Sequence, residues 1–489
     1  MATQKDQKNP TKKNSKKIRR IILLEVLILL ILVGAYQIYL IQTKKPAGNS
    51  KADTQTEDTG KIKSQGNTGS KSNSNSNSNN GKLTREELAA QQEQEKLQKE
   101  EQERKDLIAQ ADRLTMSYDY DGAIKLIQSY KGPDGGYDVY PILTNAISGY
   151  EATKSTLVLY GGSYDSVTQF NHIFFHSLVA DTSKAFDGDR NTTGYNMYMT
   201  TISEFKKIIQ TMYDNGYVLV NLHDIAKKVT LSDGTTKFEA QKIYLPQGKK
   251  PFVLSQDDVS YYQYMDGDGF ASRIVLGPDG KPTCEMKLDN GTVTTGPFDM
   301  VPIIDQFVEE HPDFSYKGAK GLIALTGYEG VMGYRTNNPE SPTYEQDKKD
   351  AKSVADAMKA EGWEFGSHSW GHKNSQTIST SRLETDTKRW LNEVEPLVGP
   401  TDIYVFPFGV DNETTLGHYT SDKFKYLKDN GFDFFIGVYK EPWMQIKDDY
   451  VRMTRRPLDG QAMLQFPERV SDLFNVKDVL DPARPPINW

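Results

Sequence analysis

The chain has 489 residues, of which 59 are basic and 66 acidic, so its net charge of −7 offers no positive field for a phosphate backbone and predicts no nucleic-acid partner. The only cysteine, Cys284, excludes an intramolecular disulfide and any metal site built from several cysteines. Because only 37% of the residues are apolar, we expect one large globular unit with solvated segments attached to it.

The N-terminus has the pattern of a membrane anchor. Residues 1–20 carry eight Lys or Arg and one acid, and residues 21–42 are almost wholly apolar, with Glu25 as the only charge. At ~1.5 Å per residue such a helix matches the ~30 Å hydrocarbon core of a bilayer, whereas a signal peptide has only ~7 to 15 apolar residues. Because basic flanks stay in the cytoplasm, we expect a single-pass protein of the cell membrane with the rest of the chain outside. A buried core helix is the weaker alternative, since no nearby segment offers a complementary apolar face.

The next two segments predict a spacer. Residues 43–82 are mostly Ser, Asn, Gly, Lys and Thr, which predicts a disordered linker because little apolar surface can be buried. Residues 83–150 predict a helical stalk that begins with a solvated helix, which we prefer to a coiled coil because apolar heptad positions are few. Within the stalk, residues 108–130 resemble a single helix-turn-helix unit of a tetratricopeptide repeat. One such unit cannot build a solenoid, so we expect a packing cap or a spacer.

From residue 155 to residue 489 the pattern changes to short β-rich runs that alternate with helical ones. This alternation predicts an α/β fold, a deformed (β/α) barrel with about seven strands. The predicted strands cover residues 169–175, 218–222, 251–254, 321–326, 363–366, 403–406 and 432–438. In such barrels the chemistry lies at the C-terminal ends of the strands, so the residues that follow each apolar run are the candidates for a site.

Two of these strand ends carry residues suited to binding a metal. One strand is followed by Asp257 and Asp258, and another by His368 and His372. Neighbouring carboxylates repel each other after a buried strand unless a cation intervenes, and two His with one carboxylate form a catalytic zinc-type ligand set. Alone, two adjacent aspartates more often form a turn or a helix start, and two histidines four positions apart are more often a chance or surface pair. Together they predict one divalent metal ion, with zinc favoured, and leave one carboxylate spare.

The motifs at these positions resemble those of the polysaccharide deacetylase (NodB-homology) family. Residues 255–258 are similar to its Thr-Phe-Asp-Asp motif, residues 368–372 match its His-Ser/Thr-x-x-His motif, and residues 404–409 resemble the aromatic-Pro-Tyr-Gly stretch of its third motif. The strand 172–176, which ends in His176, resembles the poly-N-acetylglucosamine deacetylase branch. The likeness covers roughly residues 165–465, so residues 155–489 are expected to form the catalytic domain.

The resemblance implies roles for the residues of the site. Asp257 would be the general base, and Asp258, His368 and His372 would bind the metal. A backbone N–H in the stretch Pro407, Phe408 and Gly409 would help to stabilise the charge on the carbonyl oxygen. The implied activity is removal of N-acetyl groups from an N-acetylglucosamine-containing polysaccharide, peptidoglycan or exopolysaccharide. An O-acetyl sugar esterase with the same metal site and a catalytically weak glycan-binding envelope protein are the alternatives.

The chain departs from the family pattern at two functional positions. Many relatives have an Arg in the third motif that orients the base, where this chain has Val405 and Phe406. No His follows His418, so the late His that acts as general acid in many relatives is missing. His176 is our candidate for that acid, a structural histidine being the equal alternative, and His418 is a weaker candidate.

Residues at about 260–298 are rich in Gly and Asp, with turn signals between short β-prone runs, which predicts a hairpin insertion beside the site. Several aromatic residues are candidates for flat surfaces that would bind sugar rings. These are Tyr261, Tyr262, Tyr328, Tyr334 and Trp370. The expected partners are thus an N-acetylated glycan and the membrane, and the sequence does not identify a protein partner.

Overall fold

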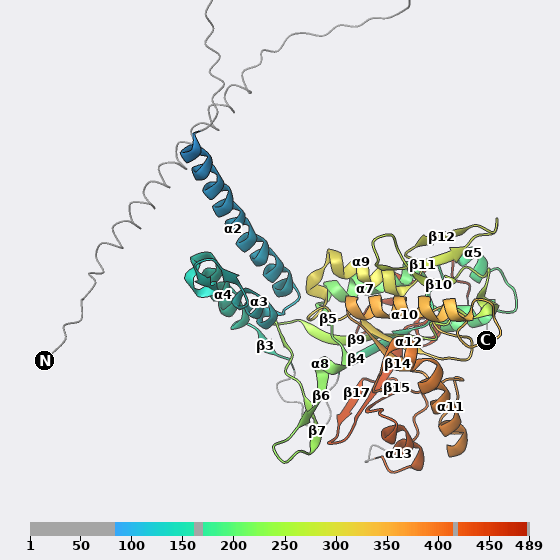
Figure 1. Cartoon of the computed structure of the whole chain (residues 1–489). Coiled ribbons are helices and arrows are strands. Elements are labelled where there is room, and N and C mark those ends of the chain that lie inside the picture. The colour runs from blue at the N-terminus through green and yellow to red at the C-terminus, as the bar shows by residue number, and fades with distance from the viewer. Residues whose placement is uncertain (1–83, 161–169, 414–418, 487–489) are drawn as a thin grey trace, which may run out of the picture. The chain divides into compact units, whose positions relative to one another are not determined.

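The computed structural model describes residues 84–160, 170–413 and 419–486 (Figure 1). The predicted cytoplasmic tail (1–20), membrane anchor (21–42) and linker (43–82) lie outside the described residues, as does His418. Within the described ranges, no helix combines the length and the apolar character that a membrane span requires.

Three helices form the N-terminal part of the described chain: α2 (Arg85–Met116), α3 (Tyr120–Gln128) and α4 (Pro141–Lys154). Thr84 starts α2 with a capping box, in which its hydroxyl accepts the Glu87 N–H and the Glu87 carboxylate accepts the Thr84 N–H. The facing sides of the three helices bury small and aliphatic residues, including Ala111, Ala123 and Leu143. The predicted helix-turn-helix is thus continuous with the solvated helix before it and is completed by a third helix.

Seven parallel strands close into a barrel. Their order around the ring is β13-β14-β15-β16-β18-β4-β9, and β9 pairs again with β13. The strands are β4 (Asn171–Phe175), β9 (Lys250–Asp257), β13 (Gly321–Leu325), β14 (Trp363–Ser367), β15 (Ile403–Val405), β16 (Phe434–Val438) and β18 (Val451–Pro457). The predicted (β/α) barrel of seven strands is confirmed, and its helices pack on the outside (Figure 1).

The identity of one barrel strand differs from the prediction. The run predicted at 218–222 forms β5 (Tyr217–Leu219), which pairs with the beginning of β9 and is not part of the closed ring. The seventh strand of the ring is instead β18, which the sequence did not reveal because it carries three arginines. They are buried because each meets a carboxylate: Arg452 pairs with Asp411, Arg455 with Asp257, and Arg456 with Asp472.

Alternation along the strands decides which residues face the barrel interior. Val253, Leu322 and Met453 belong to one hydrophobic cluster, whereas their neighbours Leu254 and Ile323 belong to the cluster that contains the outer helices. The main outer helices are α7 (Ile202–Asp214), α9 (Met300–Glu310), α10 (Tyr344–Glu361), α11 (Thr380–Glu393), α12 (Glu395–Val398), α13 (Asp422–Asp429) and α14 (Gly460–Gln465). Because side chains alternate with a period of two, Asp257 and Arg455 share the inward face of Val253 and Met453.

Among the described residues, four small sheets lie outside the ring, of which β1 with β2 and β3 with β8 are the two shortest. β10 (Arg273–Leu276), β11 (Pro282–Lys287) and β12 (Val293–Gly296) form an antiparallel sheet after β9, and β6 (Ala226–Thr230) pairs with β7 (Thr236–Ala240). The remaining elements are β1 (Lys131–Gly132), β2 (Gly135–Gly136), η1 (Tyr137–Val139), β3 (Val158–Leu159), α5 (Thr182–Ala185), α6 (Thr192–Tyr198), α8 (Leu222–Ile225), β8 (Tyr244–Leu245), η2 (Gln263–Met265), η3 (Pro312–Phe314), η4 (Pro407–Gly409), β17 (Trp443–Ile446), η5 (Pro467–Arg469) and α15 (Val476–Val479).

Candidate active site

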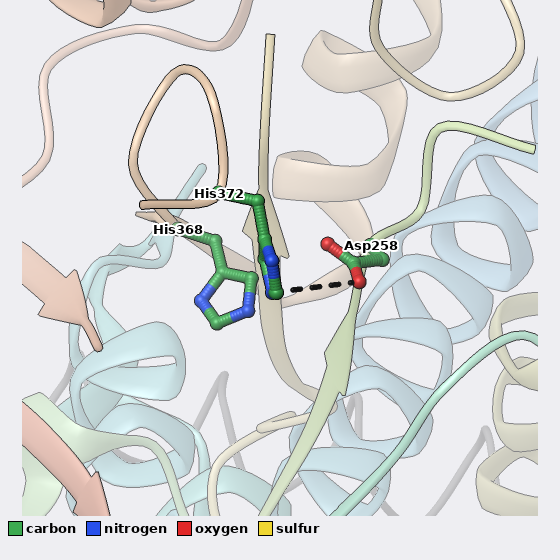
Figure 2. Close-up of side chains that lie close together, drawn as sticks. All are labelled: Asp258, His368 and His372. Atoms are coloured by element: carbon green, nitrogen blue, oxygen red, sulfur yellow. Dashed lines mark ion pairs between the residues drawn. The ribbon is translucent and has the colours of Figure 1, made fainter. Parts of the chain in front are cut away.

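Three of the sequence-predicted residues converge at the C-terminal end of the barrel. Asp258 follows β9 directly, His368 follows β14 directly, and His372 lies one short loop later. One ligand atom from each of the three lies within 4.8 Å of the others, and His372 Nε2 is 3.8 Å from Asp258 Oδ2. Figure 2 shows the three side chains turned toward one another, with Asp258 at the end of its strand.

The backbone at these positions adopts conformations that non-glycine residues rarely take. Among the described residues, eight non-glycine residues have a positive φ, and five of them lie in the motifs or in the turn after Asp258. These five are Asp258 (φ 55°), Tyr261 (47°), Ser369 (60°), His372 (49°) and Phe408 (59°). Such conformations cost ~1 to 3 kcal/mol each and persist only where the surrounding structure imposes them, which marks this region as functional.

The loop that carries the two histidines is fixed by a residue of α11. Asp386 is buried, and its carboxylate accepts hydrogen bonds from Ser369 Oγ (2.6 Å), from the Trp370 N–H and from the Gly371 N–H. Behind the loop, His368 Nδ1 donates to the Val405 carbonyl at 2.9 Å, which leaves Nε2 for a ligand. Asp386 therefore positions the histidine motif, and no sequence pattern indicated it because it lies on the inner side of an ordinary amphipathic helix.

The three converging residues fit a divalent cation. Asp258 Oδ1 is buried and has no hydrogen-bond partner among the described residues. Burying an unpaired carboxylate oxygen costs free energy unless a cation binds it. Burial lowers the pKa of both His368 and His372 to about 4, so both imidazoles are neutral, as metal ligands must be. Two histidines and one carboxylate match a catalytic zinc-type set with an open position.

Asp257 lies beside this set in a buried ion pair. Arg455 Nη1 and Nη2 contact the two carboxylate oxygens of Asp257 at 2.5 and 2.6 Å, and the two side chains are only 1% and 3% exposed. Burial alone would raise the pKa of Asp257, but Arg455 and then His368 hold it well below its usual range. Asp257 Oδ2 also lies 3.6 Å from His368 Nε2, so the ionised carboxylate borders the candidate metal ligands.

Arg455 supplies to Asp257 the arginine that the third motif lacks, so this carboxylate is held differently from the pattern of many relatives. β18 brings Arg455 to Asp257 across β4, the strand that lies between β18 and β9 in the ring. Buried hydrogen bonds hold the Arg455 side chain in place. Arg455 Nη1 donates to Ser255 Oγ (3.2 Å), and Ser255 Oγ is also hydrogen-bonded to His172 Nε2 (2.9 Å). The sequence signal was weak, since Arg455 and Arg456 lie in no recognised motif.

His176, the candidate acid, follows β4 directly and lies at the same end of the barrel. Its Nδ1 donates to the Tyr198 carbonyl at 3.1 Å, because a carbonyl oxygen can only accept, so Nε2 is the nitrogen left for proton exchange. His176 is close enough to help lower the pKa values of both Asp257 and His372. It is half-buried, in contrast to the fully buried His172 on the same strand.

The other predicted residues fall into two groups. Phe408, in η4 with Pro407 and Gly409, is 64% exposed, and its ring lies 4.4 Å from that of His372, whereas the Gly409 N–H already donates to the Phe406 carbonyl.

The predicted sugar-binding surfaces need correction. Tyr261, Tyr262 and Tyr334 are at most 5% exposed, and Tyr261 donates to Asp299 (2.6 Å). One face of the half-buried Trp370 ring is covered by Arg389.

Comparison with known proteins gives a family for part of the chain. Residues 334–427 match the family model "Polysaccharide deacetylase", a stretch that includes both histidines of the site. Over this part of the chain the match agrees with the family resemblance of the motifs and with the prediction of a hydrolase. No curated protein matches the chain.

Three solved structures are similar to the chain. The deacetylase PplD of Streptococcus pyogenes in complex with acetate is 12% identical over 63% of this chain and 98% of that one, with a TM-score of 0.36. A de-N-acetylase from Aggregatibacter actinomycetemcomitans is 14% identical over 63% of this chain and 100% of that one, with a TM-score of 0.36. A putative polysaccharide deacetylase from Mycobacterium smegmatis is 14% identical over 32% of this chain and 44% of that one, with a TM-score of 0.21. The functional conclusion rests on the family match and the residues of the site.

Proposed function

We propose that this chain, a member of the polysaccharide deacetylase family, removes N-acetyl groups from an N-acetylglucosamine-containing polysaccharide in a metal-dependent reaction. One observation carries the proposal: an ionised aspartate held by a buried arginine adjoins a set of two histidines and one aspartate at the open end of a barrel. This arrangement supplies a base next to a cation site, as hydrolysis of an unactivated amide requires.

Asp258, His368 and His372 would hold the cation, with zinc favoured by the donor set. When bound, a divalent cation would polarise the amide carbonyl as a Lewis acid and lower the pKa of a neighbouring water molecule. Asp257 accepts the proton of the attacking water, and Arg455 keeps its carboxylate ionised and fixed in orientation. The water oxygen bonds to the acetyl carbon, and the bond from that carbon to nitrogen breaks.

His176 supplies the proton that the leaving nitrogen needs. Its Nδ1 hydrogen bond to the Tyr198 carbonyl fixes the ring, so a protonated Nε2 can donate to the sugar amine as it departs. The products are acetate and a free amine on the sugar. With Arg455 present, the main reason for regarding the protein as a catalytically weak glycan binder no longer applies.

The place of the reaction is also part of the proposal. The basic segment at 1–20 and the apolar segment at 21–42 support a single-pass membrane protein whose catalytic domain meets its glycan outside the cell. Labelling of an introduced cysteine at Lys373 in intact cells by a membrane-impermeant reagent tests this orientation. Labelling that requires cell lysis would overturn it.

An acetate-release assay tests the activity. Full-length protein should release acetate from N-acetylglucosamine pentasaccharide, lose activity after chelation, and regain it with Zn²⁺. Asp257→Asn should abolish turnover while the bound metal remains. Release of acetate from acetate esters alone would favour the O-acetyl esterase, and pentasaccharide binding without turnover by the metal-loaded protein would overturn the enzymatic proposal.

A further inference from the structure

One buried carboxylate that the mechanism does not use connects several segments of the candidate site. Asp299 is 1% exposed and directly precedes the outer helix α9. Its Oδ1 accepts hydrogen bonds from Gln256 Nε2 (2.7 Å), from the Leu178 N–H (3.0 Å) and from the Met300 N–H (2.8 Å). Its Oδ2 accepts one from the Tyr261 hydroxyl (2.6 Å). A single side chain therefore joins the segments that follow β4 and β9 to the start of α9.

Capping of α9 explains only one of these four bonds. An N-cap side chain normally accepts the N–H of the second or third helical residue. Asp299 instead accepts the N–H of Met300, the first residue, and the third residue, Pro302, has no N–H to offer. The other three donors lie 38 to 121 positions earlier in the chain. The carboxylate therefore serves the segments of the site more than it serves the helix.

Gln256 links Asp299 to the segment of the candidate acid. Gln256 is fully buried, directly precedes the base Asp257, and is the register partner of Phe175 on β4. Its Nε2 donates to the carbonyl of His176 (3.3 Å) as well as to Asp299. Because a backbone carbonyl and a carboxylate can only accept, these two partners fix the orientation of the amide. The phenylalanine that the family motif has at this position could form neither bond.

Tyr261 links Asp299 to the turn that follows the candidate metal ligand Asp258. Tyr261 is 2% exposed, and its φ of 47° and the φ of 55° at Asp258 both lie where non-glycine residues are rare. Such conformations persist only where the surrounding structure imposes them. The bond from the Tyr261 hydroxyl to Asp299 supplies part of this support, and Arg335 Nη2, which donates to the Tyr261 carbonyl at 2.6 Å, supplies another part.

We propose that Asp299 is a positioning residue that sets the spacing of the candidate acid, base and metal ligand at the ends of β4 and β9. This inference rests on the proposed deacetylase function. Asp299 acts on the site through the Gln256 amide and the Tyr261 hydroxyl, so each link has its own consequence. A sugar amine leaves only when an acid protonates it, whereas p-nitrophenolate leaves without a proton. Loss of the link to the acid should therefore slow amide hydrolysis but not hydrolysis of p-nitrophenyl acetate.

Gln256→Met tests the link to the acid, because methionine keeps the length of the side chain and removes both N–H donors. The kcat for acetate release from N-acetylglucosamine pentasaccharide should fall by about 10- to 100-fold, with KM within about 2-fold of the wild-type value. Turnover of p-nitrophenyl acetate and Zn²⁺ affinity should stay within about 2-fold. The matched control is Gln445→Met, at a buried glutamine of β17 whose register partner Arg452 lies near the start of β18, and it should change none of these quantities.

Tyr261→Phe tests the link to the metal ligand, because it removes only the hydroxyl. Zn²⁺ affinity should fall by about 3- to 10-fold in a competition titration, a modest loss because Arg335 still holds the backbone of the turn. With saturating Zn²⁺, the ratio of pentasaccharide turnover to p-nitrophenyl acetate turnover should equal that of the wild type. Tyr217→Phe, at a buried tyrosine beside the beginning of β9, is the matched control and should bind Zn²⁺ as the wild type does.

Variants of Asp299 itself complete the test. Asp299→Leu removes every acceptor and should show both defects, whereas Asp299→Asn keeps an oxygen for Gln256 and should retain kcat within about 5-fold. If Asp299→Leu does not fold, the Gln256 and Tyr261 variants still decide the question.

The outcomes separate this inference from the proposed function. Gln256→Met that slows both substrates equally, or neither, would overturn the link to the acid. Unchanged Zn²⁺ affinity in Tyr261→Phe would overturn the link to the metal ligand. A Zn²⁺-loaded wild type that releases no acetate from any N-acetylated substrate would overturn the deacetylase and, with it, the link to the acid. The Zn²⁺ titration of Tyr261→Phe would then decide the remaining link alone.

Discussion

Replacing Arg455 by methionine should damage both stability and catalysis. The substitution removes two short hydrogen bonds, of 2.5 and 2.6 Å, from an aspartate that is only 3% exposed. Removing one partner of a buried ion pair costs about 3 to 5 kcal/mol, because the other charge remains in a medium of low dielectric constant. At roughly 2 to 4 °C per kcal/mol for a domain of this class, the melting temperature should fall by about 6 to 20 °C.

Arg455→Met should also lower kcat by about two to three orders of magnitude, because the base is no longer held in position. Urea denaturation followed by circular dichroism gives the stability change, and acetate release gives kcat. In the double variant with Asp257→Asn the unpaired charge is gone, so much of the lost stability should return. Arg455→Lys keeps the charge but not the two-pronged geometry and should fall between the wild type and Arg455→Met. A fully stable and active Arg455→Met protein would refute this reasoning.

Three further variants address residues outside the catalytic set. Asp386→Ala frees the histidine loop and should weaken metal binding by about 10- to 100-fold in a Zn²⁺ competition titration, whereas unchanged affinity would mean that the loop orders itself. Arg484→Met leaves Glu204 buried without its partner and should lower the free energy of unfolding by about 3 to 5 kcal/mol, while Arg469→Met, at an exposed pair, should change it by less than about 1 kcal/mol. For His223, burial would lower the pKa, but hydrogen bonds to Asp402 and Glu364 raise it to about 10. A folded-state pKa above the unfolded value near 6.5 stabilises the protein fully below pH 6.5, and this contribution disappears as the pH rises through 10. The stability advantage of the wild type over His223→Gln should therefore shrink between pH 7 and 10, and a constant difference in thermal melts would argue against it.

The candidate metal-ligand set was predictable because its signal is local. A buried strand appears as an apolar run, and the residue after it stands at the functional end of the barrel, which located Asp258 and His368 without a structure. Arg455 could not be found in this way. It contacts Asp257 from 198 positions away, and β18 lacks the apolar pattern of a buried strand because its charges are neutralised by partners that only the folded chain brings close.

The aromatic residues show a second limit of sequence analysis. Tyr261 and Tyr264 lie three positions apart and have the same chemistry, yet one is 2% exposed and the other 49%. The difference arises from Asp299, a buried acceptor for the Tyr261 hydroxyl, and from the rings of Tyr195 and Tyr262 that support Tyr264. Exposure is thus decided by tertiary packing. Identifying which tyrosines are exposed required the packed structure.

The adjacency of β4 and β18 bears on how the protein is made. Ile173 pairs with Arg456, so the first strand of the ring and the last one to be synthesised are neighbours. During translation, an emerging chain that already contains Asp257, His368 and His372 still has an open ring and no Arg455 beside Asp257. The chain can therefore become active only after nearly all of it has left the ribosome. Truncated chains that end before residue 451 are expected to be inactive.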